Sequence, residues 1–288
     1  MFNNLTSTQK GIALALIGYS GFAISDASAK FLTGHYDIFV IIAYIMLIAS
    51  GFLLAAAPFL GGITRPAKGA LRYHALRTVM NFLVSVFIVY AFAQLPLATI
   101  YAIIFAKPFL AALLAIPLYR ERVTAARWAA IAVGFCGVLI AMRPGASGID
   151  PALLLPLAAA ICAAVMWVST RSLQGESIFN MAFYPIAGTF ILSLLVSLSD
   201  FQIPAIGHLV FFIICGAGVS TGCIGLSLAF STAPSAAVSP FHYTQMVWGL
   251  VFGVLVFGDY PDLYTIIGAA VIIASGLFLI YRERSFSQ

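Results

Sequence analysis

The chain has 288 residues, of which 62% are hydrophobic and 8% are charged, and its mean hydropathy is +1.07. About a quarter of the residues of a soluble domain are charged. This composition therefore excludes a soluble globular domain and indicates an integral membrane protein.

Long apolar runs separated by short polar segments fill the chain. A helix needs about 20 apolar residues to cross the hydrocarbon, whereas the strands of a membrane barrel give short alternating runs, which this sequence lacks. We therefore predict an all-α integral membrane protein with ten transmembrane helices. The predicted helices begin near Gln9, Ile38, Arg72, Leu97, Thr124, Pro151, Ile178, Ile206, Ser235 and Asp262.

The connections between these helices are short, and only segments 61–71 and 143–150 are longer than a few residues. No connection is large enough to form a soluble catalytic or nucleic-acid-binding domain. The first apolar run is too long for the core of a signal peptide, so we interpret it as the first transmembrane helix.

Basic residues gather on one side of the predicted bundle. Because Lys and Arg that flank transmembrane helices stay in the cytoplasm, we predict a bacterial-type inner membrane protein with both termini cytoplasmic. The net charge of +5 is then a topology signal rather than a nucleic-acid-binding surface. The cytoplasmic flanks hold Lys10, Arg65, Lys68, Arg72, Arg120, Arg122, Arg127, Arg171, Arg282 and Arg284. The opposite flanks hold Lys30, Arg143, Asp37, Asp150, Asp200, Asp259 and Asp262.

The two halves of the chain repeat one pattern. At an offset of 138 residues, Pro96 aligns with Pro234 and Glu121 with Asp259. We predict two five-helix repeats, residues 1–143 and 150–284. Since five is odd, the second repeat enters the membrane in the opposite sense, and such inverted repeats are typical of secondary transporters that bind substrate near the midplane. One chain supplies both repeats, so a monomer is expected to function.

Longer segments repeat as well. AFAQLPLATIYAII in the first half is echoed by AFSTAPSAAVSPF in the second, and YRERVTAARWAAIAVGFCGVLI by FGDYPDLYTIIGAAVIIASGLFLI. With the ten predicted helices, these segments resemble EamA-type drug/metabolite transporters over nearly the whole chain. The resemblance implies cytoplasmic termini and a central cavity through which small metabolites move in either direction. The family's usual Gly-Glu at the turn is Arg120-Glu121 in the first half and Gly258-Asp259 in the second, which leaves the role of these acids open.

The segment SDASAKFLTGHYD places Asp26 and Lys30 late in the first helix. It resembles a subset of the superfamily that includes importers of cofactor-like metabolites such as riboflavin and S-adenosylmethionine. Asp26 and Lys30 are four residues apart and can pair along one helix, which we favour slightly. The alternative is a gating or coupling role. Lys30 aligns with Arg171 at an offset of 141 residues, and inverted repeats would place the two at opposite mouths.

Lys107 lies about ten residues into the apolar run from 97 to 119. An ionised lysine at the bilayer centre costs about 3 kcal/mol on insertion scales, so Lys107 should face protein, water or a ligand. Pro108 follows it and loosens the helix. A positive charge there suits a carboxylate or phosphate. The alternative is a lysine that pairs structurally with another helix or reaches toward the lipid headgroups. Lys107 aligns with Gln245, which favours a pocket shared by both repeats.

Other polar residues lie within the predicted helices. His242 and Gln245 are three residues apart and share a helical face. His242 can couple movement to protons, or it is a buried histidine satisfied by a hydroxyl. On the third helix, Arg77 and Asn81 belong to a polar stripe that must face the interior or a cavity. We expect Arg77 to reach the lipid headgroups and Asn81 to be the better substrate-binding candidate.

Aromatic side chains recur near these polar residues. Together they can form a wall for a planar or apolar substrate group, and packing against lipid or helices explains each one equally well. The candidates are Tyr101, Trp167, Tyr184, Tyr243 and Trp248.

Neither a metal site nor a cofactor is expected. The four cysteines lie in apolar runs without the spacing of metal ligands, and no disulfide is expected. The sequence lacks G-x-x-x-x-G-K-[ST], so ATP is not the expected energy source. Coupling to a proton or a counter-substrate is expected instead.

These patterns predict a secondary transporter and not an enzyme. It would move a small anionic or zwitterionic metabolite, amino-acid-like or cofactor-like, by alternating access, with Lys107 on the acidic group and Asn81, His242 and Gln245 supplying hydrogen bonds. A broad-specificity exporter of amino acids or drugs is the alternative, and the residues fit import and export equally. A channel or a membrane-embedded enzyme is less favoured, the latter because the acids are scattered over opposite ends.

Overall fold

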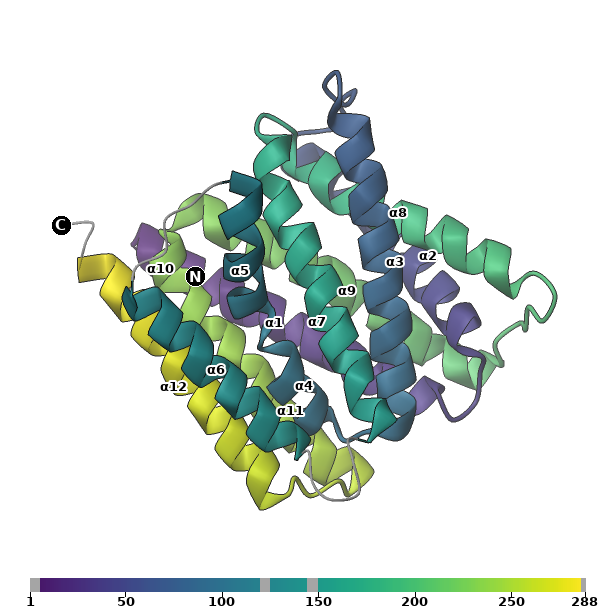
Figure 1. Ribbon diagram of the computed structural model, residues 1–288. Coiled ribbons are helices and arrows are strands. Elements are labelled where there is room, and N and C mark those ends of the chain that lie inside the picture. Colours follow the sequence, from purple (N-terminus) through teal and green to yellow (C-terminus); the bar gives the residue numbers. More distant parts are fainter. Residues whose placement is uncertain (1–5, 120–124, 144–149, 286–288) are drawn as a thin grey trace.

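The computed structural model describes residues 6–119, 125–143 and 150–285, and all secondary structure in these ranges is helical (Figure 1). The expected turn at Arg120-Glu121 lies outside the described residues. The α-helices are α1 (Ser7–Leu32), α2 (Ile38–Ala56), α3 (Ala70–Gln94), α4 (Leu97–Ile104), α5 (Lys107–Tyr119), α6 (Ala125–Met142), α7 (Leu154–Ser169), α8 (Ile178–Ser197), α9 (Ile206–Thr232), α10 (Ser235–Val238), α11 (Thr244–Phe252) and α12 (Leu263–Ser285). Short helical turns adjoin them at η1 (Ala57–Phe59), η2 (Pro151–Leu153), η3 (Thr170–Leu173), η4 (Ser239–Tyr243) and η5 (Gly253–Phe257).

Eight segments of the described chain are long and apolar enough to cross a membrane. Two shorter apolar helices, Trp128–Met142 and Leu263–Phe278, lie where the fifth and tenth helices are predicted. The chain is therefore a multi-pass, all-helical membrane protein, as the sequence predicts. Ten crossings remain a prediction, because these two helices are shorter than the other eight.

Local sequence explains where the helices begin. Thr6 and Gln9 form a capping box at the start of α1, Asp37 caps α2, and Ser177 caps α8. Pro96 adopts an extended conformation between α3 and α4, because a proline cannot donate the hydrogen bond that would continue a helix.

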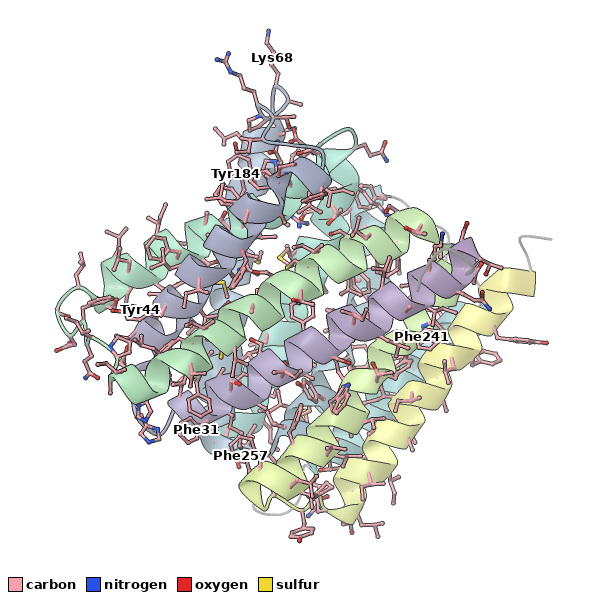
Figure 2. All side chains as sticks on the ribbon, turned by 180° about the vertical axis from the view of Figure 1, so that it is seen from behind. Phe31, Tyr44, Lys68, Tyr184, Phe241 and Phe257 are labelled. Atoms are coloured by element: carbon pink, nitrogen blue, oxygen red, sulfur yellow. The ribbon has the colours of Figure 1, made fainter. Side chains whose placement is uncertain are left out.

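Glycines allow α1 and α9 to pack along each other, as Figures 1 and 2 show. A Cβ atom added at Gly218 of α9 would lie 2.5 Å from the carbonyl oxygen of Gly21 on α1. The pair α6 and α12 is equally close, since a Cβ atom at Gly268 would lie 2.6 Å from the carbonyl oxygen of Gly137. Because lipid is as apolar as the side chains, such close backbone contact is a main source of helix association in a membrane.

We expect Gly218→Ala to lower the thermal unfolding midpoint of the purified protein. The added methyl group would meet backbone atoms rather than a flexible side chain, and overpacking of this kind costs about 1–3 kcal/mol. Gly51→Ala is the matched control, because no atom lies within 4 Å of the Cβ added there. Equal unfolding midpoints for the two variants would contradict this packing role.

A polar junction joins the loop between α2 and α3 to the start of α8. The Glu176 carboxylate accepts hydrogen bonds from the Ala67 backbone N–H at 2.6 Å and from the Asn180 side-chain amide at 2.8 Å. It also lies 3.5 Å from the His74 imidazole. The Asn180 amide in turn donates to the Thr64 carbonyl at 3.1 Å. The Ala67 N–H and the Asn180 amide hold the pKa of the Glu176 carboxyl below its usual range.

This junction predicts a pH dependence of stability. The carboxyl of an unfolded chain has a pKa near 4.3; the folded value is lower, so the carboxylate stabilises the fold above that pH and loses this effect as the pH falls through the folded pKa. We expect Glu176→Gln to cost about 1–3 kcal/mol of stability at pH 7, with a deficit that shrinks in acid. Thermal unfolding over a pH series measures this, with Asp200→Asn as the exposed-acid control. A deficit that stays constant with pH would rule out the carboxylate as its source.

Candidate functional site

Two of the apolar spans are interrupted. In Leu97–Tyr119, α4 ends at Ile104 and α5 begins at Lys107, and the Ala106 N–H bonds to the Ile103 carbonyl in a tight turn. Pro108 has no N–H with which to restore the regular pattern. In the second half, η4 separates α10 from α11 and carries Pro240 near its start. Irregular backbone at membrane depth is tolerated where it is buried in protein or lines a cavity.

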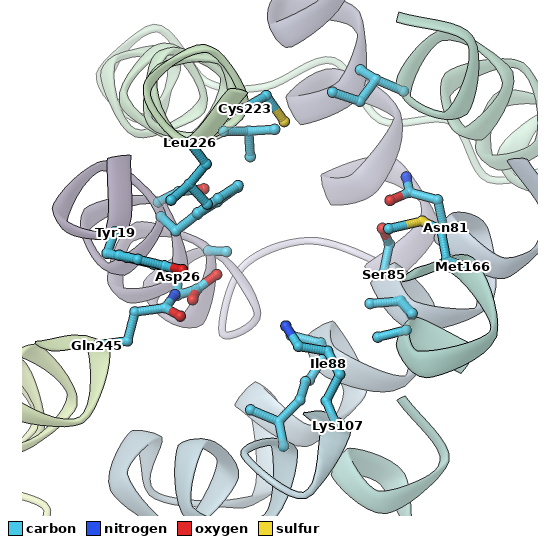
Figure 3. A pocket seen from close by; sticks show the side chains of 18 of the residues that line it. Tyr19, Asp26, Asn81, Ser85, Ile88, Lys107, Met166, Cys223, Leu226 and Gln245 are labelled. Carbon is cyan, nitrogen blue, oxygen red and sulfur yellow. The ribbon is translucent and has the colours of Figure 1, made fainter. Parts of the chain in front are cut away.

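A cavity of about 500 Å³ lies between the helices beside these interruptions (Figure 3). Both halves of the chain contribute to its wall, with α1, α2, α3, α4 and α5 from the first half and α7, α8, α9 and α11 from the second. Six of the substrate-binding candidates from the sequence line it: Asn81, Tyr101, Lys107, Trp167, His242 and Gln245.

Lys107 extends into this cavity (Figure 3). Its ammonium lies 5.4 Å from the centre of the Trp167 ring, and no carboxylate of the described residues forms an ion pair with it. A cation over an aromatic ring gains about 0.5–2 kcal/mol, whereas taking an ammonium out of water costs several kcal/mol. The ammonium is therefore available to an anionic group in the cavity.

Three further polar candidates meet the same space. Asn81 donates its side-chain amide to the Thr189 hydroxyl at 2.9 Å, which ties α3 to α8 and leaves the amide oxygen free to accept. The His242 ring stacks on Tyr19 with their centres 5.1 Å apart. Gln245 reaches the cavity from α11 (Figure 3). The site can thus offer a cation, hydrogen-bonding groups and aromatic faces to one ligand.

Asp26 also lines the cavity, although the sequence suggested a pair with Lys30. The Asp26 carboxylate accepts a hydrogen bond from the Tyr101 hydroxyl at 2.7 Å. The Lys30 ammonium instead lies 3.0 Å from the Asp259 carboxylate and donates to the Leu95 carbonyl at 2.6 Å. The favoured pair along α1 is therefore wrong, because Lys30 finds two oxygens beyond the end of its own helix while Asp26 turns to the cavity.

The expectation that Arg77 reaches the lipid headgroups is also wrong. Its side chain is buried, with 8% of the residue exposed. The guanidinium donates to the Met166 carbonyl at 3.0 Å, to the Thr170 hydroxyl at 2.5 Å and to the Met181 carbonyl at 3.2 Å. These oxygens lie within the bundle, so Arg77 joins α3 to α7, η3 and α8, and its side chain lines the cavity there.

The remaining candidates lie outside the cavity wall. Tyr184 packs against the His74 ring, with ring centres 4.6 Å apart. Trp248 donates its indole N–H to the Ser20 hydroxyl at 2.9 Å. The Arg171 guanidinium lies 5.1 Å from the centre of a tyrosine ring. Their observed contacts are with other side chains of the protein.

The chain matches a known protein family over most of its length. The EamA-like transporter family matches residues 9–143 and again residues 150–282. This chain belongs to the EamA-like transporter family. An S-adenosylmethionine uptake transporter of Rickettsia prowazekii is 27% identical over 290 residues, which cover 99% of this chain and 97% of the relative. A riboflavin transporter of Rhizobium johnstonii is 32% identical over 198 residues, which cover 66% of this chain and 64% of that protein.

A solved crystal structure has the same fold as this EamA-like transporter. It is 18% identical, the match covers 98% of this chain and 99% of the other, and the TM-score is 0.66. The family and the named relatives establish that the chain is a membrane-embedded transporter of small metabolites rather than an enzyme.

Sequence reasoning missed part of the cavity wall of this EamA-like transporter. Tyr19, Phe22, Asp26 and Ala29 all line it from α1. Their spacings of three and four residues put them on one helical face, so the signal was present. The expected pair with Lys30 gave Asp26 a partner on its own helix and therefore no reason to face a cavity.

The cavity predicts selective labelling of one cysteine in the transporter. Cys223 lines the cavity, whereas Cys215 is fully buried and its thiol donates to the Ser25 carbonyl. In variants that keep only one of the four cysteines, we expect a small polar maleimide to modify Cys223 in the folded protein and to leave Cys215 unmodified. Mass spectrometry before and after denaturation measures this. Labelling of both cysteines in the folded state would contradict the observed packing.

Proposed function

We propose that this EamA-like transporter is a secondary transporter that takes up a small anionic or zwitterionic metabolite by alternating access. The observation that carries the proposal is the ammonium of Lys107, which faces a cavity at a helix interruption without a carboxylate partner among the described residues. An acidic group bound there would compensate the cost of the buried charge and add charge-assisted hydrogen bonds. Asn81, His242 and Gln245 would hydrogen-bond other parts of the substrate.

The helix contacts support two inverted five-helix repeats, residues 1–143 and 150–284. Helix α1 packs along α9, its counterpart α7 packs along α3, and α6 packs along α12. Exchanging the two halves turns the α1–α9 contact into the α7–α3 contact and maps the α6–α12 contact onto itself. The two interrupted spans also correspond to each other, and substrate sites of inverted-repeat transporters lie at such interruptions. One chain then supplies the whole path, so we propose that a monomer functions, in an inner membrane with both termini cytoplasmic.

The contacts of Lys30 support a gating role at one mouth of the path. Lys30 joins the end of α1 to the turn before α4 and to the turn after η5. The side chains of Lys30 and Asp259 are 13% and 28% exposed, so this ion pair is mostly buried and would hold the mouth closed until both groups gain other partners. A proton or a counter-substrate would drive the cycle, with His242 and Asp26 as the coupling candidates.

The aromatic residues of the cavity support a substrate with a planar ring. Phe22, Trp167 and Phe230 line the cavity from three different helices. The named relatives carry S-adenosylmethionine and riboflavin, both of which contain a flat heteroaromatic ring system. Stacking on aromatic side chains adds to binding without requiring a particular ring. We therefore propose uptake of a metabolite that combines such a ring with an acidic group.

We expect Lys107→Ala to abolish uptake while the protein stays folded. Removing one member of a buried ion pair costs about 3–5 kcal/mol, equivalent to a loss of at least about 100-fold in affinity. Uptake of radiolabelled S-adenosylmethionine into proteoliposomes measures the effect, with the unfolding midpoint as the folding control. Lys68→Ala, at the exposed tip of the α2–α3 loop (Figure 2), is the matched control. Normal flux in Lys107→Ala would remove Lys107 from the mechanism.

A further inference from the structure

Asp26, Arg77 and Lys107 are charged side chains that line the cavity of the transporter, and the Arg77 guanidinium donates to three oxygens of the protein. Asp26 and Lys107 have opposite charges and do not neutralise each other. Asp26 on α1 and Lys107 on α5 approach the cavity from different sides (Figure 3). No ion pair joins them, and neither has another charged partner within residues 6–119, 125–143 and 150–285. Unpaired charges out of water are costly, so this arrangement points to a ligand.

The structure holds the Asp26 carboxylate in place without neutralising it. The Tyr101 hydroxyl donates to one carboxylate oxygen at 2.7 Å, and Tyr101 is 3% exposed. Gly249 on α11 makes room for the Tyr101 ring, because a Cβ atom there would lie 2.4 Å from that ring. A carboxylate can accept about four hydrogen bonds. Most of its accepting capacity therefore remains for a group in the cavity.

The cation closest to Asp26 along α1 is held elsewhere. Lys30 is one helical turn away, but its ammonium is engaged by the Asp259 carboxylate and by the Leu95 carbonyl. These contacts join α1 to two other segments and direct the charge away from the cavity. The fold thus keeps Asp26 free of the partner that its sequence neighbourhood offers.

We propose that Asp26 and Lys107 form a bipolar binding site for a zwitterion, meaning a substrate that carries both a cationic and an anionic group. This assignment rests on the proposed transport function and narrows its substrate class. Lys107 binds the carboxylate of the substrate, and Asp26, oriented by Tyr101, binds its ammonium or sulfonium group. The aromatic residues that line the cavity hold the rest of the molecule.

The two charges also select against other classes of ligand. A purely anionic ligand satisfies Lys107 but brings a negative charge towards Asp26, and a purely cationic ligand does the reverse. A neutral ligand leaves both charges buried without a partner. Specificity arises from such penalties on wrong ligands as much as from contacts to the right one.

A ligand series tests the proposal in purified protein in nanodiscs. The zwitterionic probes are S-adenosylmethionine and methionine. Decarboxylated S-adenosylmethionine and 3-(methylthio)propylamine lack the carboxylate, and 4-(methylthio)butanoate lacks the ammonium group. The Kd of each probe is measured by calorimetry for wild type, Asp26→Asn and Lys107→Gln. Asp200→Asn and Lys68→Gln remove the same charges at exposed sites outside the cavity and serve as controls.

The expected result is that removing a charged group from the ligand and removing the residue that binds it have corresponding effects on Kd. For wild type, removing either charged group from a zwitterion weakens binding by about tenfold or more. In Asp26→Asn, removing the ammonium group from the ligand changes Kd by less than about twofold, because the interaction with that group is already lost. In Lys107→Gln, removing the carboxylate from the ligand changes Kd by less than about twofold for the same reason. The control variants bind as wild type does. A merely structural defect in a variant would not make Kd insensitive to one particular ligand group.

Several results would overturn the proposal. One is that wild type and Asp26→Asn bind a zwitterion with equal Kd. Another is that wild type binds 4-(methylthio)butanoate and methionine with equal Kd. A third is that wild type binds neither of the two zwitterions. Proteoliposome uptake separates this assignment from the proposed function. Uptake of S-adenosylmethionine that is insensitive to Asp26→Asn would preserve transport and remove the bipolar site. Paired ligand losses without any flux would preserve the site and remove transport.

Discussion

The inability of hydrocarbon to solvate backbone polar groups and charges is the constraint on which this structure depends. It explains why all secondary structure of the described residues is helical, and why the interruptions near Lys107 and in η4 lie beside a cavity. It also explains the contacts of the other charges within the bundle. Arg77 donates to three oxygens, and Lys30 contacts two. Within the part of the chain that the structure describes, Lys107 has no such oxygen and Asp26 has a single hydroxyl donor, and both line the cavity.

The same constraint shapes the packing, because apolar side chains gain little by leaving lipid for protein. Close contact between helix backbones stabilises the bundle instead. The glycines that permit this contact lie where α1 meets α9 and where α6 meets α12. Each of these pairs takes one helix from each half of the chain. Close backbone packing therefore joins the two halves, and both halves contribute to the wall of the cavity.

The helix positions followed from the sequence because they depend on local properties. Runs of apolar residues and breaks such as Pro96 placed each helix start within about two residues of its position in the structure. Lys107, Asn81 and Gln245 were found for the same reason, since a polar residue deep in an apolar run stands out by itself. Tyr184 and Trp248 were equally conspicuous, yet they pack against His74 and Ser20. Which side of a helix meets the cavity depends on how the helices are arranged, which their own sequences do not specify.

Charged residues near the helix ends were harder to assign, because several partners compete for each of them. The spacing of Asp26 and Lys30 offers a pair along α1 worth only a few tenths of a kcal/mol. Asp259 and the Leu95 carbonyl offer Lys30 two oxygens at once, from segments 229 and 65 residues away in the sequence. A contact that joins three segments contributes to the tertiary fold, whereas a pair within one helix does not. Lys30 therefore joins these segments, and the Asp26 carboxylate, without Lys30 as a partner, faces the cavity.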